Sequence, residues 1–346
     1  MTQMNSNLNR RRFIATSGAM LAAPSVLRAQ GTTEFVMSMW LGPTNHTWYN
    51  VFEPWAEGVN QLTEGRVKIN LTFPALGSPV EHLELIQTGT ADLGFAAHGY
   101  SGDQAFPRAK IGQFSFLGDA FGASHAYSKV YTQLLDADQE HLDQGVHLMG
   151  VYQHGPGALM LKDKVIRTPD DYQGLRIRTP GGYISLLMED LGIEPVAMSP
   201  FGVRDAMAAG ELDGVAFAVG GSLTFKVEEE VNYISTVPGG YYNTSFFAAM
   251  NPQSADRISS EDFATIKKYS AETIHVLAGK SYDQQDYESM APFLERNTVV
   301  EPVPDETLAH VREIAAGYEQ RWTEEIASQG YDGAKALAYT RRITGS

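Results

Sequence analysis

The stretch of sequence that decides the fold is "GLRIRTPGGYISLLMEDLGIEPVAMSPFGVRDAMAAGELDGVAFAV", residues 174–219. Apolar residues alternate in "LRIRTP" and follow a helical period in "YISLLMEDLG"; "PVAMSP", "FGVRDAMAAGEL" and "GVAFAV" then indicate a strand, a helix and a strand. Strands and helices that alternate with short glycine-containing connections are typical of an α/β sheet flanked by helices. In such sheets a ligand binds beyond the carboxyl ends of the strands.

The same alternation precedes this stretch and continues after it. Strands are predicted over 34–40, 66–73, 91–97, 154–161 and 245–251, and helices over 47–65 and 79–90. The segment 299–303 and a helix over 305–330 are expected to complete the second lobe. A long helix is also predicted from Ser260, with Glu261 and Asp262 in its cap, because no Gly or Pro interrupts the chain from Ser259 to Ala278. The length of 346 residues favours two domains, and we expect the long helix to run along both.

The first 29 residues have the layout of an export signal. Three arginines, Arg10 to Arg12, precede a modest apolar run over 15–23 and a small-residue end at Ala29. The arginines followed by Phe13 and Ile14 resemble the twin-arginine (Tat) pattern, with a surface amphipathic helix as the alternative. Cleavage after residue 29 removes four arginines and no acid, which changes the formal net charge from −15 to −19. We expect a soluble periplasmic protein after cleavage.

Composition excludes several function classes. So acidic a chain repels phosphate backbones, which makes nucleic acid an unsuitable partner. The chain has no cysteine, and its nine histidines have no metal-ligand spacing. It also has no P-loop and no HExxH, GxSxG or GxGxxG motif. We therefore expect a protein that is not an enzyme and that needs no cofactor or metal.

Arg178 is the main candidate for a binding residue. Leu175 and Ile177 point to one face of the predicted strand and Arg176 and Arg178 to the other, and Pro180 ends the strand. A guanidinium at this carboxyl end would point into the ligand crevice, where its planar fork suits a carboxylate. The alternative is an arginine that faces solvent or forms a salt bridge, which we expect for Arg176. Asp213 in "GELDGV" is interpreted as a turn former that binds its own backbone.

Histidines and aromatic residues near predicted strand ends indicate an apolar cleft with few polar anchors. Taken singly, each aromatic residue is more often part of the core. The candidate polar contacts are His46, His98 and His154, and the candidate walls are Trp40, Tyr100, Phe217, Tyr241 and Tyr242.

Several segments resemble one protein family. "TPDDYQGLRIRTPG" (168–181), "LGIEPVAMSP" (191–200) and "AMAAGELDG" (206–214) resemble the signature of the DctP-like solute-binding proteins of TRAP transporters. The segments 45–59 and 63–95 resemble the upstream parts of the same family, so the likeness covers nearly the whole mature chain.

The resemblance implies a periplasmic-binding-protein-like fold of two α/β lobes, joined by crossing strands and a long helix and closing over a solute like a hinge. It implies lobe I over 30–154 plus 243–290 and lobe II over 155–242 plus 291–346. It also implies a periplasmic receptor that delivers a small organic anion to the membrane permease subunits, with Arg178 as carboxylate anchor.

Two departures from the family pattern narrow the expected solute. Many members that bind sialic acid or C4-dicarboxylates have a second arginine one strand earlier, where this chain has Gly157 or a close neighbour. After "DG", where relatives often have Asn or an acid, it has Val215, Ala216 and Phe217. The cleft thus loses a cation and gains an aromatic ring, which favours a monocarboxylate. The alternative function is a ligand-sensing module of the same fold that feeds a signalling partner, and an exported α/β enzyme is a third class.

Overall fold

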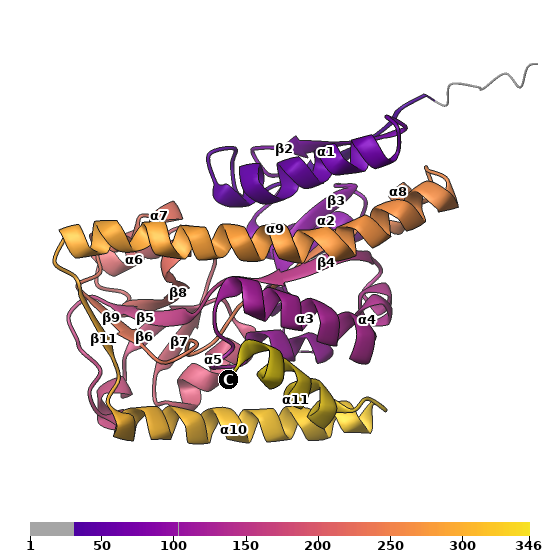
Figure 1. The fold of residues 1–346 in the computed structure, drawn as a ribbon. Helices are drawn as coiled ribbons and strands as arrows, with labels where there is room; N and C mark the ends of the chain where they lie inside the picture. Colours follow the sequence, from indigo (N-terminus) through magenta and orange to yellow (C-terminus); the bar gives the residue numbers. More distant parts are fainter. Residues whose placement is uncertain (1–30, 103) are drawn as a thin grey trace, which may run out of the picture. The chain divides into compact units, whose positions relative to one another are not determined.

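Two β-sheets flanked by helices organise the described part of the chain, residues 31–102 and 104–346 of a computed structural model (Figure 1). The predicted export signal, residues 1–29, lies outside these residues. The observed architecture agrees with the predicted two-lobed α/β class, because each sheet has its own helices and the chain passes between the two.

The first sheet has the strand order β2-β1-β3-β10-β4. Its strands are β1 (Thr33–Ser38), β2 (Val67–Thr72), β3 (Leu93–Ala97), β4 (His147–Gln153) and β10 (Ser245–Met250). β1 runs parallel to β2 and β3, and β10 is antiparallel to β3 and β4. The helical segments of this part are η1 (Trp48–Phe52), α1 (Glu53–Leu62), η2 (Pro79–Glu81), α2 (His82–Gln87), η3 (His98–Ser101), η4 (Arg108–Gln113), α3 (Ala120–Leu134), α4 (Ala137–Asp143) and α8 (Pro252–Ala255).

The second sheet has the order β11-β9-β5-β8-β6-β7. Its strands are β5 (Gly157–Leu161), β6 (Arg176–Thr179), β7 (Glu194–Ala197), β8 (Gly214–Ala218), β9 (Tyr233–Thr236) and β11 (Val299–Pro302). β6 is parallel to β7 and β8, whereas β5 is antiparallel to β8 and β9. The remaining segments are η5 (Pro169–Tyr172), α5 (Gly182–Asp190), α6 (Val203–Ala208), α7 (Val219–Thr224), η6 (Val227–Glu229), α9 (Ser260–Glu295), α10 (Asp305–Ser328) and α11 (Gly333–Thr344).

The long helix α9 connects the two halves of the described part. It packs on β4 of the first sheet and on α7 beside the second (Figure 1). It continues through Gly279, where an added Cβ would lie 2.7 Å from the Cα of Phe121 on α3, so a side chain there would clash with backbone. The cap differs by one residue from the prediction: the Ser259 hydroxyl accepts the N–H of Asp262 at 3.0 Å, and Ser260 is the first helical residue.

Two connections cross between the sheets. Residues 154–156 lead from β4 into β5, and residues 237–244 lead from β9 back into β10. The structure also contains elements that the sequence pattern does not indicate, namely α3, α4, β4, α7, β9 and α11. α11 packs on α3 and α10.

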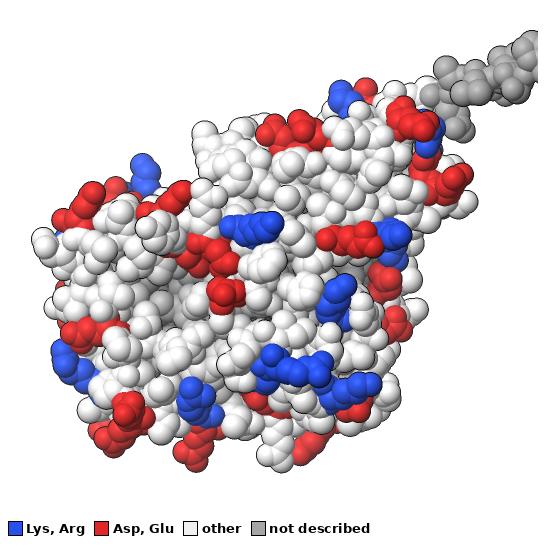
Figure 2. Space-filling model, in the orientation of Figure 1, with Lys and Arg blue, Asp and Glu red and all other residues white. Residues whose placement is uncertain are grey.

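The interpretation of Asp213 holds for its structural role but is wrong in its partner. Its carboxylate accepts the backbone N–H of Arg176 at 2.8 Å and binds the guanidinium of the same residue at 2.7 Å. Arg176 is therefore salt-bridged, as expected. On the face drawn in Figure 2, acidic and basic side chains are interspersed. Among the helices of residues 31–102 and 104–346, none is both long and apolar enough to span a bilayer.

Candidate functional site

A cavity that is partly open to solvent lies between the carboxyl end of β6 and the crossing connections. Both halves of the described part contribute to its wall: the β1–η1 loop, η3, β10 and α9 on one side, and β6, β8 and α7 on the other. Its wall is largely aromatic and apolar, with few polar side chains, which is the usual construction of a small-molecule site. Seven predicted residues line it: Trp40, His46, Tyr100, His154, Arg178, Phe217 and Tyr242.

Arg178 provides the positive charge of the cavity. Only 2% of its surface is exposed, and its Nε donates to the carbonyl oxygen of Met198 at 2.9 Å. Within the described residues its buried Nη2 has no hydrogen-bond partner, and no Asp or Glu forms a salt bridge with it. A buried guanidinium without an anion is costly, so this end of the cavity favours a negatively charged group.

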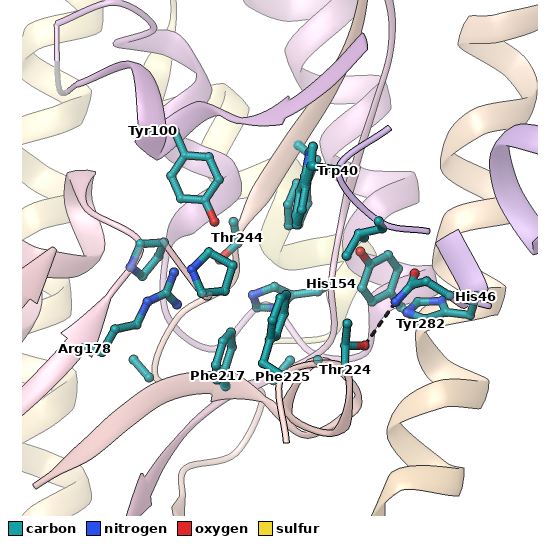
Figure 3. Close-up of a pocket in the computed structure, with 18 of the residues that line it drawn as sticks. Trp40, His46, Tyr100, His154, Arg178, Phe217, Thr224, Phe225, Thr244 and Tyr282 are labelled. Carbon is teal, nitrogen blue, oxygen red and sulfur yellow. Dashed lines mark hydrogen bonds between the residues drawn. The ribbon is translucent and has the colours of Figure 1, made fainter. Parts of the chain in front are cut away.

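Aromatic rings form the middle of the cavity. The guanidinium carbon of Arg178 lies 4.9 Å from the ring centre of Phe217, and Phe217 stacks on Phe225 with centroids 5.6 Å apart. Figure 3 shows Trp40 across the gap from these two rings. The Trp40 indole is fixed by its N–H, which donates to the carbonyl of Phe95 at 3.1 Å. The cavity therefore has aromatic rings on two opposite sides.

The end far from Arg178 is polar but uncharged (Figure 3). Burial lowers the pKa of His46 to about 4, so its ring is neutral at physiological pH. Its Nδ1 lies 2.9 Å from the hydroxyl oxygen of Ser281 on α9. Beside it, Asn45 Nδ2 donates to Thr224 Oγ1 at 3.0 Å, a bond that joins the β1–η1 loop to α7.

Tyr100, Tyr242 and His154 complete the wall around Arg178. Burial raises the pKa of Tyr100 and of Tyr242, while the Arg178 charge lowers both in part and a hydrogen bond with Arg178 also lowers that of Tyr100. Both hydroxyls therefore keep their protons at neutral pH. Burial also lowers the pKa of His154 to about 4. The surroundings of Arg178 thus contain neutral polar groups and no carboxylate among the described lining residues.

Two of the predicted site residues do not line this cavity. His98 is buried in the core, with its ring centre 5.1 Å from that of Phe106 and its Nδ1 3.2 Å from the carbonyl oxygen of Ser245. The Tyr241 hydroxyl lies 2.9 Å from the hydroxyls of Tyr172 and Ser235, also in the core. Adjacent residues of an extended chain point to opposite sides, so Tyr241 and Tyr242 could not both face one cavity.

The structure adds lining residues that sequence reasoning missed. They are Leu41, Asn45, Pro180, Pro200, Ala216, Ala218, Gly221, Thr224, Phe225, Thr244, Phe246 and Tyr282. Thr244 and Phe246 have the same parity as Tyr242 along one extended segment, a signal that could have identified them. Tyr282 lies near the middle of α9, where no local pattern distinguishes it.

Comparison with known proteins agrees with this architecture. Residues 37–325 match the family of bacterial extracellular solute-binding proteins, family 7 (DctP). The chain belongs to this family. The outer membrane transporter protein TsaT of Comamonas testosteroni is 24% identical over 336 residues, which are 96% of this chain and 98% of the relative.

Solved structures give the same result. A TRAP periplasmic solute-binding protein of Bordetella bronchiseptica, with bound (R)-mandelate and (S)-mandelate, has a TM-score of 0.84 and 30% identity and covers 90% of this chain and 99% of its own. A TRAP solute-binding protein from Rhodoferax ferrireducens, with copurified benzoate, has a TM-score of 0.80 and 25% identity. The match covers 91% of this chain and 98% of the Rhodoferax ferrireducens chain. This DctP protein is thus a TRAP solute receptor, and its family and structural neighbours are receptors rather than enzymes.

No group of three or more His, Asp or Glu residues in the described part of this DctP protein is placed to hold a metal ion. The lining of the cavity offers one cation, several neutral hydrogen-bonding groups and apolar rings.

Proposed function

We propose that this DctP protein binds a small aromatic monocarboxylate in the Arg178 cavity and delivers it to the membrane permease subunits of a TRAP transporter. The solute's carboxylate would contact Arg178, and its ring would lie between Trp40 and the Phe217–Phe225 pair. The chemistry is binding and release, with no covalent step.

The observation that carries this proposal is the buried Arg178 with an unpartnered Nη2. Its Nε is held by the Met198 carbonyl, so the guanidinium is oriented before a solute arrives. A carboxylate could accept from the two Nη groups at once, and charge-assisted bidentate bonds are among the stronger hydrogen bonds in proteins. A bound anion would also compensate the cost of burying the charge.

The preference for one carboxylate and an aromatic body rests on the rest of the wall. Arg178 is the one Arg or Lys among the described lining residues, and the opposite end carries the neutral His46. A second carboxylate would lose its hydration there without gaining a cation. The rings of Trp40, Phe217 and Phe225 form an apolar wall against which a flat solute can pack.

The relatives support the same solute class. The Bordetella bronchiseptica protein holds mandelate and the Rhodoferax ferrireducens protein holds benzoate. Both solutes are aromatic acids with one carboxylate. We further propose export through the predicted signal over residues 1–29, a periplasmic location, and the two lobes 30–154 plus 243–290 and 155–242 plus 291–346 as the halves that close on the solute.

Isothermal titration calorimetry with benzoate and with each mandelate enantiomer tests the proposal. We expect Arg178→Ala to weaken binding at least about tenfold, or roughly 1.4 kcal/mol, because the carboxylate loses its charged donor. Arg178→Met, which keeps most of the side-chain volume without the charge, should lose as much. A solute at about 100 times its Kd should stabilise the wild-type protein by roughly 2.7 kcal/mol in thermal unfolding.

Arg176→Ala is the matched control. It removes an arginine two residues away on the same strand, whose side chain is 40% exposed and paired with Asp213 outside the cavity. The affinity of the Arg176→Ala variant for each acid should equal that of the wild type. Equal loss in the Arg176 and Arg178 variants, or unchanged affinity in Arg178→Ala, would contradict the anchor role.

A further inference from the structure

His154 faces the cavity with one ring nitrogen already committed. The residue is 8% exposed and lies on the β4–β5 crossing. Its Nδ1 is 2.5 Å from the carbonyl oxygen of Gly155. A carbonyl can only accept a hydrogen bond, so Nδ1 carries the proton, and in a neutral imidazole Nε2 then presents a lone pair.

The surroundings of His154 keep the ring neutral. Burial is the main cause of its lowered pKa of about 4, and the charge of Arg178 lowers it further. Arg178 and His154 therefore face the same cavity. Arg178 offers a cation to a solute, and His154 offers a neutral hydrogen-bond acceptor. Figure 3 shows the His154 side chain between the Arg178 end and the Tyr282 end of the cavity. No hydrogen bond within the described residues uses Nε2.

We infer that His154 makes this receptor selective for acids that carry a hydrogen-bond donor, a hydroxyl or N–H group, in addition to the carboxylate held by Arg178. The inference rests on the proposed function, because it needs the carboxylate to be anchored at Arg178. Arg178 can bind the carboxylate of any aromatic acid, whereas His154 would distinguish the acids that carry a donor from those that do not.

The rule follows from what each solute group would meet at Nε2. A hydroxyl donates to the lone pair and replaces the hydrogen bond that it loses with water. A hydrogen atom in the same position leaves the acceptor unpaired. An ether oxygen or a second carboxylate places a lone pair against a lone pair in a buried site, which is unfavourable.

Matched solute pairs test the rule on the unmodified protein. Calorimetric Kd values are measured for phenylacetate, mandelate and O-methylmandelate, and for benzoate with its three hydroxy and three methoxy isomers. At least one hydroxy acid should bind roughly fivefold more tightly than its parent, and the methoxy analogue of that isomer should lose the gain. The position of the hydroxyl group on the isomer that binds more tightly shows where the solute's donor lies relative to its carboxylate in the cavity.

His154→Phe assigns the preference to this residue. The substitution keeps an aromatic ring in the wall but removes the acceptor, so the hydroxy acid and its parent should bind equally well. The parent acid's Kd in the same variant is the internal reference, so the measured quantity is the ratio of the two Kd values, which should fall from about five to about one. A purely structural role of His154 would instead weaken all acids alike.

The outcomes separate the two proposals. If no hydroxy acid binds more tightly than its parent, or if the preference survives in His154→Phe, the inference about His154 is wrong while the anchor role of Arg178 stands. If neither the parent acids nor the hydroxy acids bind, the proposed function fails and the inference with it. Because the matched pairs need only the wild-type protein, a variant that fails to fold does not remove the test.

Discussion

Two buried arginines with opposite surroundings show how this molecule separates structure from binding. Arg108, 5% exposed, contacts Glu140 through its Nε at 3.2 Å, and its Nη1 donates to the Leu135 carbonyl at 2.8 Å. Its Nη1 also donates to the hydroxyl of Tyr331 at 2.7 Å. Arg178 is buried as deeply, and its Nη2 has no hydrogen-bond partner among the described residues. Both guanidiniums lie over an aromatic ring, so the ring does not distinguish them.

The difference shows that a guanidinium N–H without a partner, rather than burial or contact with a ring, identifies the arginine that can bind a solute. Even the paired charge at Arg108 is costly to bury: desolvation raises the pKa of Glu140, although Arg108 and the Tyr131 hydroxyl both lower it. The desolvation of Glu140 thus outweighs the attraction of its partners. Arg178 would have this cost offset only when an anion arrives.

The largest expected effect is on stability, at Arg108. Arg108→Met should lower the free energy of unfolding by about 3–5 kcal/mol, because it leaves Glu140 buried without its partner. Urea unfolding of the ligand-free protein measures this loss. The double variant Arg108→Met with Glu140→Leu should be more stable than the single variant, since it removes both charges.

Arg178→Met should show the reverse pattern. Removing a buried charge that has no anion should leave the urea midpoint at or above that of the wild type, while the affinity for benzoate falls as described above. The comparison of the two arginines would be wrong if Arg178→Met destabilised the ligand-free protein as much as Arg108→Met does.

The sequence could show which arginine to examine, but not the surroundings that decide its role. Alternation and Pro180 placed Arg178 at the carboxyl end of β6, and the structure has it there. Its burial depends on Phe217 of β8 and Met198 after β7, strands brought beside β6 only by the sheet topology. Local pattern therefore gave the position, and tertiary pairing gave the environment.

The same limit explains why two candidate site residues lie outside the cavity. The sequence predicts where the strands end, but the side of a strand end that faces the cavity depends on the helices packed behind it. His98 lies against Tyr131 of α3 and His141 of α4, and the sequence pattern predicts neither helix. α9 continues past Gly279 to Glu295, because packing on β4, α3 and α7 outweighs the local cost of a glycine.

A substitution of Asp286 should have an effect of intermediate size on stability. Like Arg178, Asp286 is an ionisable side chain without an oppositely charged partner among the described residues. Its Oδ1 accepts the N–H of Gly220 at 2.6 Å, and no Lys or Arg of the described part forms a salt bridge with it. Burial raises its pKa from 3.8 to about 7, and the nearby Asp283 adds to the rise. The folded state thus holds a proton that the unfolded chain has released, so the unfolding free energy falls as pH increases from about 4 to 7.

Asp286→Asn keeps an acceptor for Gly220 and cannot ionise. At pH 8 the variant should be more stable than the wild type by roughly 2 kcal/mol, less than the full shift in pKa implies because the carboxylate is partly exposed. Near pH 4 the difference should vanish. Thermal unfolding of both proteins across this range checks the sign, and a stability difference that does not depend on pH would contradict it.

The smallest expected effect concerns the rings under the two arginines. Phe217→Leu removes the ring face below Arg178 and one side of the stack with Phe225, so benzoate affinity should fall by about 1 kcal/mol, with little change in stability. Tyr331→Leu removes the matching ring below Arg108 and the hydroxyl bonded to its Nη1, so it should lower stability and leave benzoate affinity unchanged. Calorimetry and urea unfolding on both variants form a two-by-two test. If both substitutions changed the same quantity, the two arginines would not be divided between folding and binding as their contacts imply.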